Sequence, residues 1–302
     1  MSLTFEKLHP HFAAEVGPVD LRRVHDPETL AEIRAGMDEY AVLVFRDQPF
    51  ADDGQIAFAR RLDGELHTKT GAAALKKNRL GNEALGDISN VDENGDLLQS
   101  DDRRRMYGLG NRLWHTDASF QDPPGRYSML SARVIPPVDA DTQFADMRAA
   151  YDALPASMKA QIEGLRVHHS ITHSRRTLGF EFSKEEEEKL VGAVHPLART
   201  IPRSNRRSLY VASHASKIMD WPVPEGRLLL LDLIEHATQP EFVYRHAWRV
   251  GDLVIWDNRA TMHRARPFDD AKYRRELRRV TTLDIPEPAA SPARRGHGFV
   301  HE

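Results

Sequence analysis

The sequence predicts a β-rich α+β fold, in which helices stand near the start of the chain and in inserts between short strands. Two observations indicate this class. Short apolar runs bounded by turn residues recur through the second half of the chain, as expected for strands. These strands do not alternate regularly with helices, which argues against a doubly wound parallel sheet. No Gly-rich nucleotide-binding pattern occurs either.

The first elements are two helices around a strand. Residues 27–40 predict a helix, because apolar side chains recur there at helical spacing, namely Leu30, Ile33 and Met37. The apolar run Ala41–Phe45 that follows has the length of a strand. A second helix is expected to start near Asp52, a plausible N-cap. The polar stretch 64–108 then predicts either a binding loop or an exposed, irregular surface segment.

Most of the predicted strands come later. They are expected at 126–135, 242–248, 252–256 and 274–283. The range 144–165 is expected to contain a helix interrupted at Pro155, and 226–238 is expected to be a Leu-rich helix. The acidic run 185–188 is expected to be a solvated helix face. We expect one domain over residues 1–302, with a core at about 5–285 and a flexible tail over 286–302.

Composition limits the chemistry. The chain of 302 residues has no cysteine, which excludes disulfides, thiolate metal sites and a cysteine nucleophile. Any metal must therefore bind His, Asp or Glu, a ligand set that suits Fe(II), Mn(II) or Zn(II). A net charge of −3 indicates no attraction to nucleic acid or membranes. Since neither a signal peptide nor a membrane-spanning run is visible, we expect a cytoplasmic protein.

The candidate metal ligands are His115, Asp117 and His263. On a strand, His115 and Asp117 would point to the same face, although this pair alone could be a polar contact at a strand end. His263, which follows the predicted strand 252–256, completes a two-histidine, one-carboxylate set. Such a facial triad leaves coordination positions open for substrate and O₂.

The predicted strand 274–283 carries arginines on both faces. One face holds Arg275 and Arg279 among apolar neighbours, while the face that includes Glu276 and Arg278 is expected to be solvated. Buried arginines need anionic partners, and a guanidinium binds a carboxylate through two hydrogen bonds. Arg275 and Arg279 are therefore candidate carboxylate-binding residues; structural ion pairs are the alternative.

A resemblance to a known family rests on blocks in the same order along nearly the whole chain, apart from the last 18 residues or so. These blocks include LVFRDQP (43–49), QIAFAR (55–60), DISNV (87–91), LWHTDASFQ (113–121), RYSMLSA (126–132), FADMRAAYDALP (144–155), EFVYRHAW (241–248), GDLVIWDNR (251–259) and RRELRRVTTLD (274–284). The chain thereby resembles the taurine/2-oxoglutarate dioxygenase superfamily, and within it the enzymes that act on aryloxyalkanoates such as 2,4-dichlorophenoxyacetate. The resemblance implies a double-stranded β-helix (jelly-roll) core with helical inserts.

The resemblance also implies residue roles. His115, Asp117 and His263 match iron ligands; Thr142 and Arg275 match residues that bind the distal carboxylate of 2-oxoglutarate. Arg279 matches an arginine that binds the acidic group of the substrate. Counting forward from His263 would select Arg274 in place of Arg275, because the loop is one residue longer; strand register favours Arg275. In the substrate region, three residues are candidates for lining or binding, namely Ser89, Asn90 and Lys69, the last also being readable as an exposed lysine.

The implied activity is Fe(II)- and 2-oxoglutarate-dependent hydroxylation by O₂ beside an ether oxygen, which releases a phenol and glyoxylate together with succinate and CO₂. The implied partner is a small anionic organic substrate, with no nucleic acid or membrane, and we expect a homo-oligomer. Three alternatives stay open at this point. They are the same chemistry on a sulfonate, alkyl sulfate or other carboxylic acid, a zinc hydrolase with the same ligands, and a non-catalytic jelly-roll binding module. His214 and His246 are expected to be structural.

Overall fold

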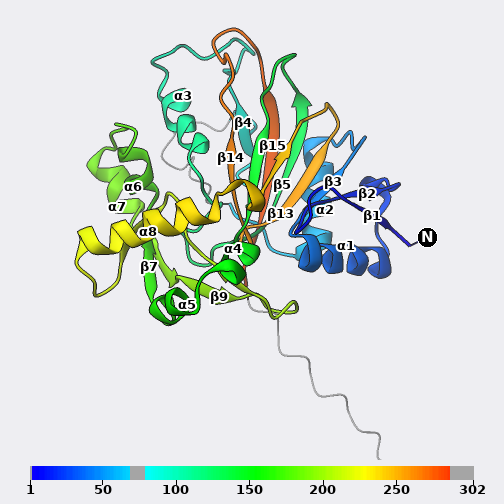
Figure 1. Cartoon of the computed structure of the whole chain (residues 1–302). Coiled ribbons are helices and arrows are strands. Elements are labelled where there is room, and N and C mark those ends of the chain that lie inside the picture. The colour runs from blue at the N-terminus through cyan, green and yellow to red at the C-terminus, as the bar shows by residue number, and fades with distance from the viewer. Residues whose placement is uncertain (1, 69–78, 286–302) are drawn as a thin grey trace, which may run out of the picture.

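The computed structural model describes residues 2–68 and 79–285, and its centre is a large, mostly antiparallel sheet (Figure 1). Within the described residues, the sheet order is β1-β2-β3-β13-β5-β15-β4, and only the β2–β3 pair is parallel. The strands are β1 (Thr4–Lys7), β2 (Ala14–Gly17), β3 (Val42–Phe45), β4 (Gly86–Ser89), β5 (Gly125–Val134), β13 (Leu253–Asp257) and β15 (Glu276–Leu283).

A smaller antiparallel sheet faces this one. It consists of β12 (Val243–His246), β6 (Thr142–Asp146) and β14 (Thr261–Ala265), in that order. One apolar cluster joins side chains of both sheets: Val44 and Trp256 come from the large sheet, and Phe144 comes from β6. The rings of Phe144 and Trp256 lie 5.4 Å apart. This pair of sheets, with its helical inserts, confirms the predicted mainly β, double-stranded β-helix fold.

Two helices cover the other face of the large sheet. They are α1 (Pro27–Tyr40) and α2 (Asp52–Asp63), and their apolar sides pack on alternate residues of the strands, such as Leu43 and Phe45 of β3. The α1 helix begins where the Asp26 side chain accepts a hydrogen bond from the backbone N–H of Thr29 at 2.8 Å. Both helices and the strand between them were predicted from the sequence.

The helical inserts cover the outer face of the small sheet. The helices here are α4 (Met147–Ala153), α5 (Ala156–Ile162) and α8 (Val223–Ala237), which share one apolar cluster with Ala145 of β6. The remaining elements are η1 (Leu21–Arg23), α3 (Arg103–Gly108), η3 (Leu109–Arg112), β7 (Arg166–His169), α6 (Ile171–Arg176), α7 (Lys184–Lys189), β8 (Ala193–Pro196), β9 (Ala198–Thr200), β10 (Arg207–Leu209), β11 (Ala215–Ile218) and η4 (Pro240–Phe242). Within the described ranges, no helix combines the length and apolar character that a bilayer crossing requires.

The range 144–165 contains the predicted helix interrupted at Pro155, because α4 and α5 lie on either side of that residue; β6, which was not predicted, precedes them, and the Asp146 carboxylate caps α4. One prediction about these elements was wrong. It concerns the face of β15 that was expected to be solvated. Glu276 and Arg278 are buried there, because α2 packs on this face and Gln55 of α2 donates a hydrogen bond to the Arg278 carbonyl at 2.9 Å. The proposed tail 286–302 lies outside the described residues, and the single-domain assignment stays a prediction.

Candidate active site

His115, Asp117 and His263 come together between the two sheets. One ligand atom from each lies within 4.8 Å of the others, and all three side chains are buried. Backbone hydrogen bonds join His115 and His263 in both directions, at 3.0 and 2.7 Å. His263 lies on β14, whereas His115 forms a single bridge and Asp117 is already in a turn. The strand expected at 115–117 is therefore reduced to one bridging residue, but the predicted convergence of the three side chains is present.

Hydrogen bonds orient this cluster. His115 Nδ1 lies 2.8 Å from the Leu113 carbonyl, which can only accept, so Nδ1 carries the proton and Nε2 has a free lone pair. This Nε2 lies 3.9 Å from Asp117 Oδ1. The Asp117 carboxylate accepts from the Ser128 hydroxyl at 2.7 Å, and its backbone N–H donates to the Asn258 amide oxygen at 3.0 Å. Such fixed outer partners are typical of histidine and carboxylate metal ligands.

The charge state of the cluster also suits a divalent cation. Burial lowers the pKa of His115 to about 4 and lowers the pKa of His263 well below its ordinary range. Burial alone would raise the pKa of Asp117, but the Arg279 guanidinium and the two histidines outweigh it and hold this pKa at about 2. At neutral pH the site thus presents two neutral imidazoles and one carboxylate, the protonation states that metal binding requires. The donor set fits Fe(II) among other divalent metals.

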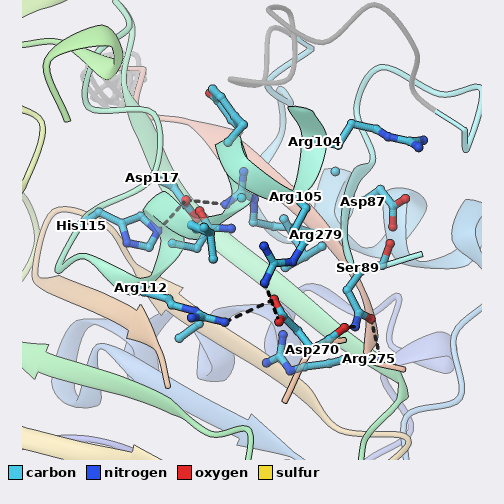
Figure 2. Close-up of a pocket in the computed structure, with 18 of the residues that line it drawn as sticks. Asp87, Ser89, Arg104, Arg105, Arg112, His115, Asp117, Asp270, Arg275 and Arg279 are labelled. Atoms are coloured by element: carbon cyan, nitrogen blue, oxygen red, sulfur yellow. Dashed lines mark hydrogen bonds and ion pairs between the residues drawn. The ribbon is translucent and has the colours of Figure 1, made fainter. Parts of the chain in front are cut away.

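The cluster opens into a cavity of about 270 Å³ beside β4, β15, α3 and α6. His115, Asp117, Arg275 and Arg279 all line this cavity, with Arg279 next to Asp117 (Figure 2). The apolar side chains in its wall are Leu85, Ile88, Val91, Leu98, Leu109, Phe120, Ile171 and Phe268. A cavity that combines apolar walls with a few guanidinium groups suits a small organic acid.

The two predicted arginines have different surroundings. Arg279 Nη1 lies 2.5 Å from Asp117 Oδ1, so its charge is already paired with the candidate metal ligand. Arg275 is buried, its Nε has no hydrogen-bond partner, and no carboxylate in the described ranges forms an ion pair with it. Burial lowers the pKa of Arg275 to about 10. A buried guanidinium without a protein anion beside it is a candidate site for a bound carboxylate.

The other predicted site residues fall into three groups. Thr142 lies buried on β6, where its hydroxyl accepts from the Trp248 indole N–H at 2.9 Å, and it is not among the residues that line the cavity. Ser89 and Asn90 do line the cavity. Lys69 lies outside the described residues.

Asn90 has a structural task that the sequence did not reveal. Its amide oxygen accepts from the Arg275 backbone N–H at 2.8 Å, and its amide nitrogen donates to the carbonyls of Asp270 and Tyr273, both at 2.8 Å. These hydrogen bonds fasten the loop that precedes β15 to β4. Asn90 therefore sets the position of Arg275, and its side-chain polar groups already have protein partners.

Two further residues lie at the site: His214, which was expected to be structural, and Arg175, which was not predicted. The ring of His214 packs 6.0 Å from that of His115, and its Nδ1 lies 3.1 Å from the Ser119 hydroxyl. Arg175 of α6 lines the cavity and was not singled out, because the polar segment Ile171–Arg176 gives no sign of burial. His246 is buried away from the cavity, 3.2 Å from Asp252 Oδ2, as expected for a structural histidine.

Comparison with known proteins matches residues 4–281 to the family described as "Taurine catabolism dioxygenase TauD, TfdA family". An alpha-ketoglutarate-dependent 2,4-dichlorophenoxyacetate dioxygenase from Cupriavidus pinatubonensis is 49% identical, over 94% of this chain and 99% of that protein. An (S)-phenoxypropionate/alpha-ketoglutarate dioxygenase from Sphingobium herbicidovorans is 37% identical, over 85% and 87%. The crystal structure of AAD-2 in complex with Mn(II) and N-oxalylglycine superposes with a TM-score of 0.89 at 46% identity, covering 94% of this chain and 98% of that one.

Proposed function

Because the chain belongs to the taurine catabolism dioxygenase TauD, TfdA family, we propose that it uses Fe(II), O₂ and 2-oxoglutarate to hydroxylate an aryloxyacetate-type acid. One observation carries this proposal: the cavity brings a two-histidine, one-carboxylate cluster together with a buried guanidinium, Arg275, that lacks a protein carboxylate. A metal site and a carboxylate site in one cavity are what a 2-oxo acid co-substrate needs. The zinc-hydrolase alternative gives no role to Arg275, and a non-catalytic binding module would typically have lost one of the three ligands.

His115, Asp117 and His263 would hold Fe(II), and two of the three, His115 and Asp117, line the cavity. When bound, Fe(II) with 2-oxoglutarate and O₂ supplies the oxidising chemistry, in which the 2-oxo acid loses CO₂ to become succinate. Arg275 would bind the distal carboxylate, with Thr142 as a second partner through its hydroxyl hydrogen. The protein's own contribution is to fix these groups before the substrate arrives.

Arg279 would attract the acid group of the substrate. Its ion pair with Asp117 places it next to the candidate metal ligands, so an acid bound near Arg279 has its neighbouring carbon close to the cluster. The apolar wall of the cavity would take the aryl ring, with Ser89 at its edge and Lys69 as a further candidate contact. Hydroxylation of the carbon beside the ether oxygen gives a hemiacetal, which breaks down to a phenol and glyoxylate.

The proposal is tested by anaerobic titration with Fe(II) and 2-oxoglutarate. We expect a weak visible charge-transfer band that His115→Ala abolishes. His236→Ala is the control, since His236 Nε2 bonds to the Ala150 carbonyl, away from the cavity. A wild-type protein that gives no band contradicts the proposal.

The substrate class needs a second measurement. Succinate release should depend on O₂ and should rise when an aryloxyacetate is added, with one phenol formed per succinate. A sulfonate and an alkyl sulfate complete the panel, because Arg279 would also attract those anions. Succinate formation without any phenol from every aryloxyacetate would contradict the substrate assignment and leave the sulfonate or sulfate chemistry in its place.

A further inference from the structure

The cavity contains a second buried arginine without a protein carboxylate. Arg175 of α6 is only 3% exposed. Its Nη1 donates to the Ser174 hydroxyl at 3.2 Å, its Nη2 lies 3.5 Å from the Asn111 amide oxygen, and its Nε has no hydrogen-bond partner. The guanidinium carbon stands 4.8 Å from the centre of the Tyr107 ring. All of these neighbours are neutral, and no carboxylate of the described residues forms an ion pair with Arg175; Asp117 acts on its charge only from a longer distance.

The other arginines of the cavity show that this is unusual. Most of them have acidic partners, namely Arg79 with Asp87 and Glu276, Arg104 with Glu93 and Asp102, Arg105 and Arg112 with Asp270 (Figure 2), and Arg279 with Asp117. Arg266 is exposed. Among the cavity arginines in the described ranges, Arg175 and Arg275 alone are both buried and without a carboxylate. Residues 69–78, which lie between the two described ranges, contain no acidic residue.

The fold makes room for this guanidinium at a residue of η3. A Cβ added to Gly110 would lie 2.1 Å from the Arg175 guanidinium carbon, so glycine is needed for Arg175 to hold its position. Burial lowers the pKa of Arg175, although the group stays charged at neutral pH. Structural arginines in this protein are arranged differently: Arg148 lies 2.9 Å from Asp146 and Arg259 lies 2.7 Å from Asp257. A buried charge without a partner is costly, which favours a ligand anion as the missing partner.

We propose that Arg175 binds the acidic group of the organic substrate and is a specificity-determining residue of this enzyme. The inference rests on the proposed function and adds a residue to it. Arg275 would be occupied by the co-substrate, and Arg279, which would also attract the acid, is already paired with Asp117. Arg175 is therefore the second guanidinium for the same acid group, and the one that binds it without competing with a protein anion. Its neighbours in the cavity wall, Ile171 and Phe120, offer apolar contact to the aryl part of the same molecule.

The test compares an acid with its uncharged analogue. Wild-type protein and Arg175→Met are loaded anaerobically with Mn(II) and N-oxalylglycine, and the dissociation constants of 2,4-dichlorophenoxyacetate and of its primary amide are measured by equilibrium dialysis. We expect Arg175→Met to weaken binding of the acid roughly 10- to 100-fold, as loss of a charged hydrogen bond does, and binding of the amide less than about 3-fold. Arg175→Lys keeps the positive charge but cannot form the two parallel hydrogen bonds of a guanidinium. Its acid-to-amide binding ratio should therefore lie between those of the wild type and Arg175→Met.

Arg103→Met is the matched control. Its guanidinium carbon also lies over an aromatic ring, 4.5 Å from the centre of Phe180, but the residue is outside the cavity and pairs with Glu186. This variant should bind acid and amide as the wild type does.

Three outcomes overturn the inference. If Arg175→Met keeps the wild-type acid-to-amide ratio, whether or not both ligands bind more weakly, Arg175 only packs against Tyr107. If Arg175→Met does not fold, Arg175→Lys decides, because a wild-type ratio there also contradicts the proposal. A wild-type protein that binds no anion of the aryloxyacetate, sulfonate and sulfate panel removes the proposed substrate class and this inference together. A missing charge-transfer band with Fe(II) and 2-oxoglutarate identifies failure of the proposed function itself, independently of the ratio.

Discussion

Replacement of Arg275 should stabilise the protein and impair co-substrate binding at the same time. Burial lowers the pKa of this guanidinium to about 10. At about 1.4 kcal/mol for each tenfold change in proton affinity, the buried charge costs the folded state about 3 kcal/mol at neutral pH. Arg275 lines a cavity, and water there screens part of this cost. We therefore expect Arg275→Met to raise the free energy of unfolding by about 1–3 kcal/mol in the absence of ligand.

The same substitution should weaken 2-oxoglutarate binding. Loss of charged hydrogen bonds to a carboxylate amounts to about 1.5–3 kcal/mol, or roughly a 10- to 100-fold higher Kd. Chemical denaturation without ligand measures the first quantity, and anaerobic titration of the Fe(II)-loaded protein measures the second. In the wild type, 2-oxoglutarate should raise the melting temperature more than it does in the variant.

Arg148→Met is the control for this reasoning. Arg148 is also buried but lies 2.9 Å from Asp146, and its loss leaves that carboxylate without its arginine partner. The control should lose about 3–5 kcal/mol of stability, while its affinity for 2-oxoglutarate stays unchanged. If Arg275→Met is destabilised to a similar degree and binds 2-oxoglutarate normally, Arg275 is a structural residue and its assignment as the carboxylate-binding group is refuted.

Three other predictions follow from the same geometry. Asn90→Ala removes the amide that fixes Arg275, so the KM for 2-oxoglutarate should rise roughly 3- to 30-fold in steady-state assays, with a smaller change in kcat. Gly110→Ala should displace the Arg175 guanidinium and lower the acid-to-amide binding ratio while the far-ultraviolet circular dichroism stays native; a wild-type ratio would argue against Arg175 as a substrate contact. Burial raises the pKa of Glu276, but hydrogen bonds from neighbouring arginines outweigh it and hold this pKa at about 2. The resulting stability is fully present above pH 4.5, the ordinary value for this carboxyl, and is lost as the pH falls through about 2. Between pH 5 and 2, the free energy of unfolding of Glu276→Gln should therefore fall by about 2–3 kcal/mol less than that of the wild type. An equal fall in both proteins, measured by acid denaturation, would contradict this.

Sequence reasoning succeeded where the residue types themselves restrict the possible structure. The His115, Asp117 and His263 set could be proposed because divalent metals need few, specific donor types, and β15 could be read because residues two apart share a face. The same reasoning placed Arg275 and Arg279 on the face directed at the small sheet, where Leu277 joins the core between the sheets. The structure brings all of these residues to one site, while their roles in binding stay predictions.

The errors come from tertiary packing. Periodicity identifies a polar face of β15 but does not show that α2 covers it, so Glu276 was misplaced. Arg175 lies in a short, polar helix, and its burial depends on Gly110, a residue distant in sequence. The strand β6 was not predicted, because it is short and runs directly into α4 at Asp146. None of these contacts can be recognised from the residues next to it in the sequence.

The origin of the cavity wall has a consequence for how new activities can arise in this scaffold. Arg275 and Arg279 belong to the β15 region of the main sheet, whereas Arg175 comes from α6 in an insert and depends on η3 for its space. With Arg275 as the proposed co-substrate contact and Arg175 as the proposed substrate contact, these two guanidinium groups come from different parts of the chain, while the other proposed substrate contact, Arg279, stays with β15. An exchange of 103–112 together with 171–176 should therefore change the Arg175 contribution to acid preference between homologous scaffolds without rebuilding the metal cluster, which makes these two short segments suitable units for library design.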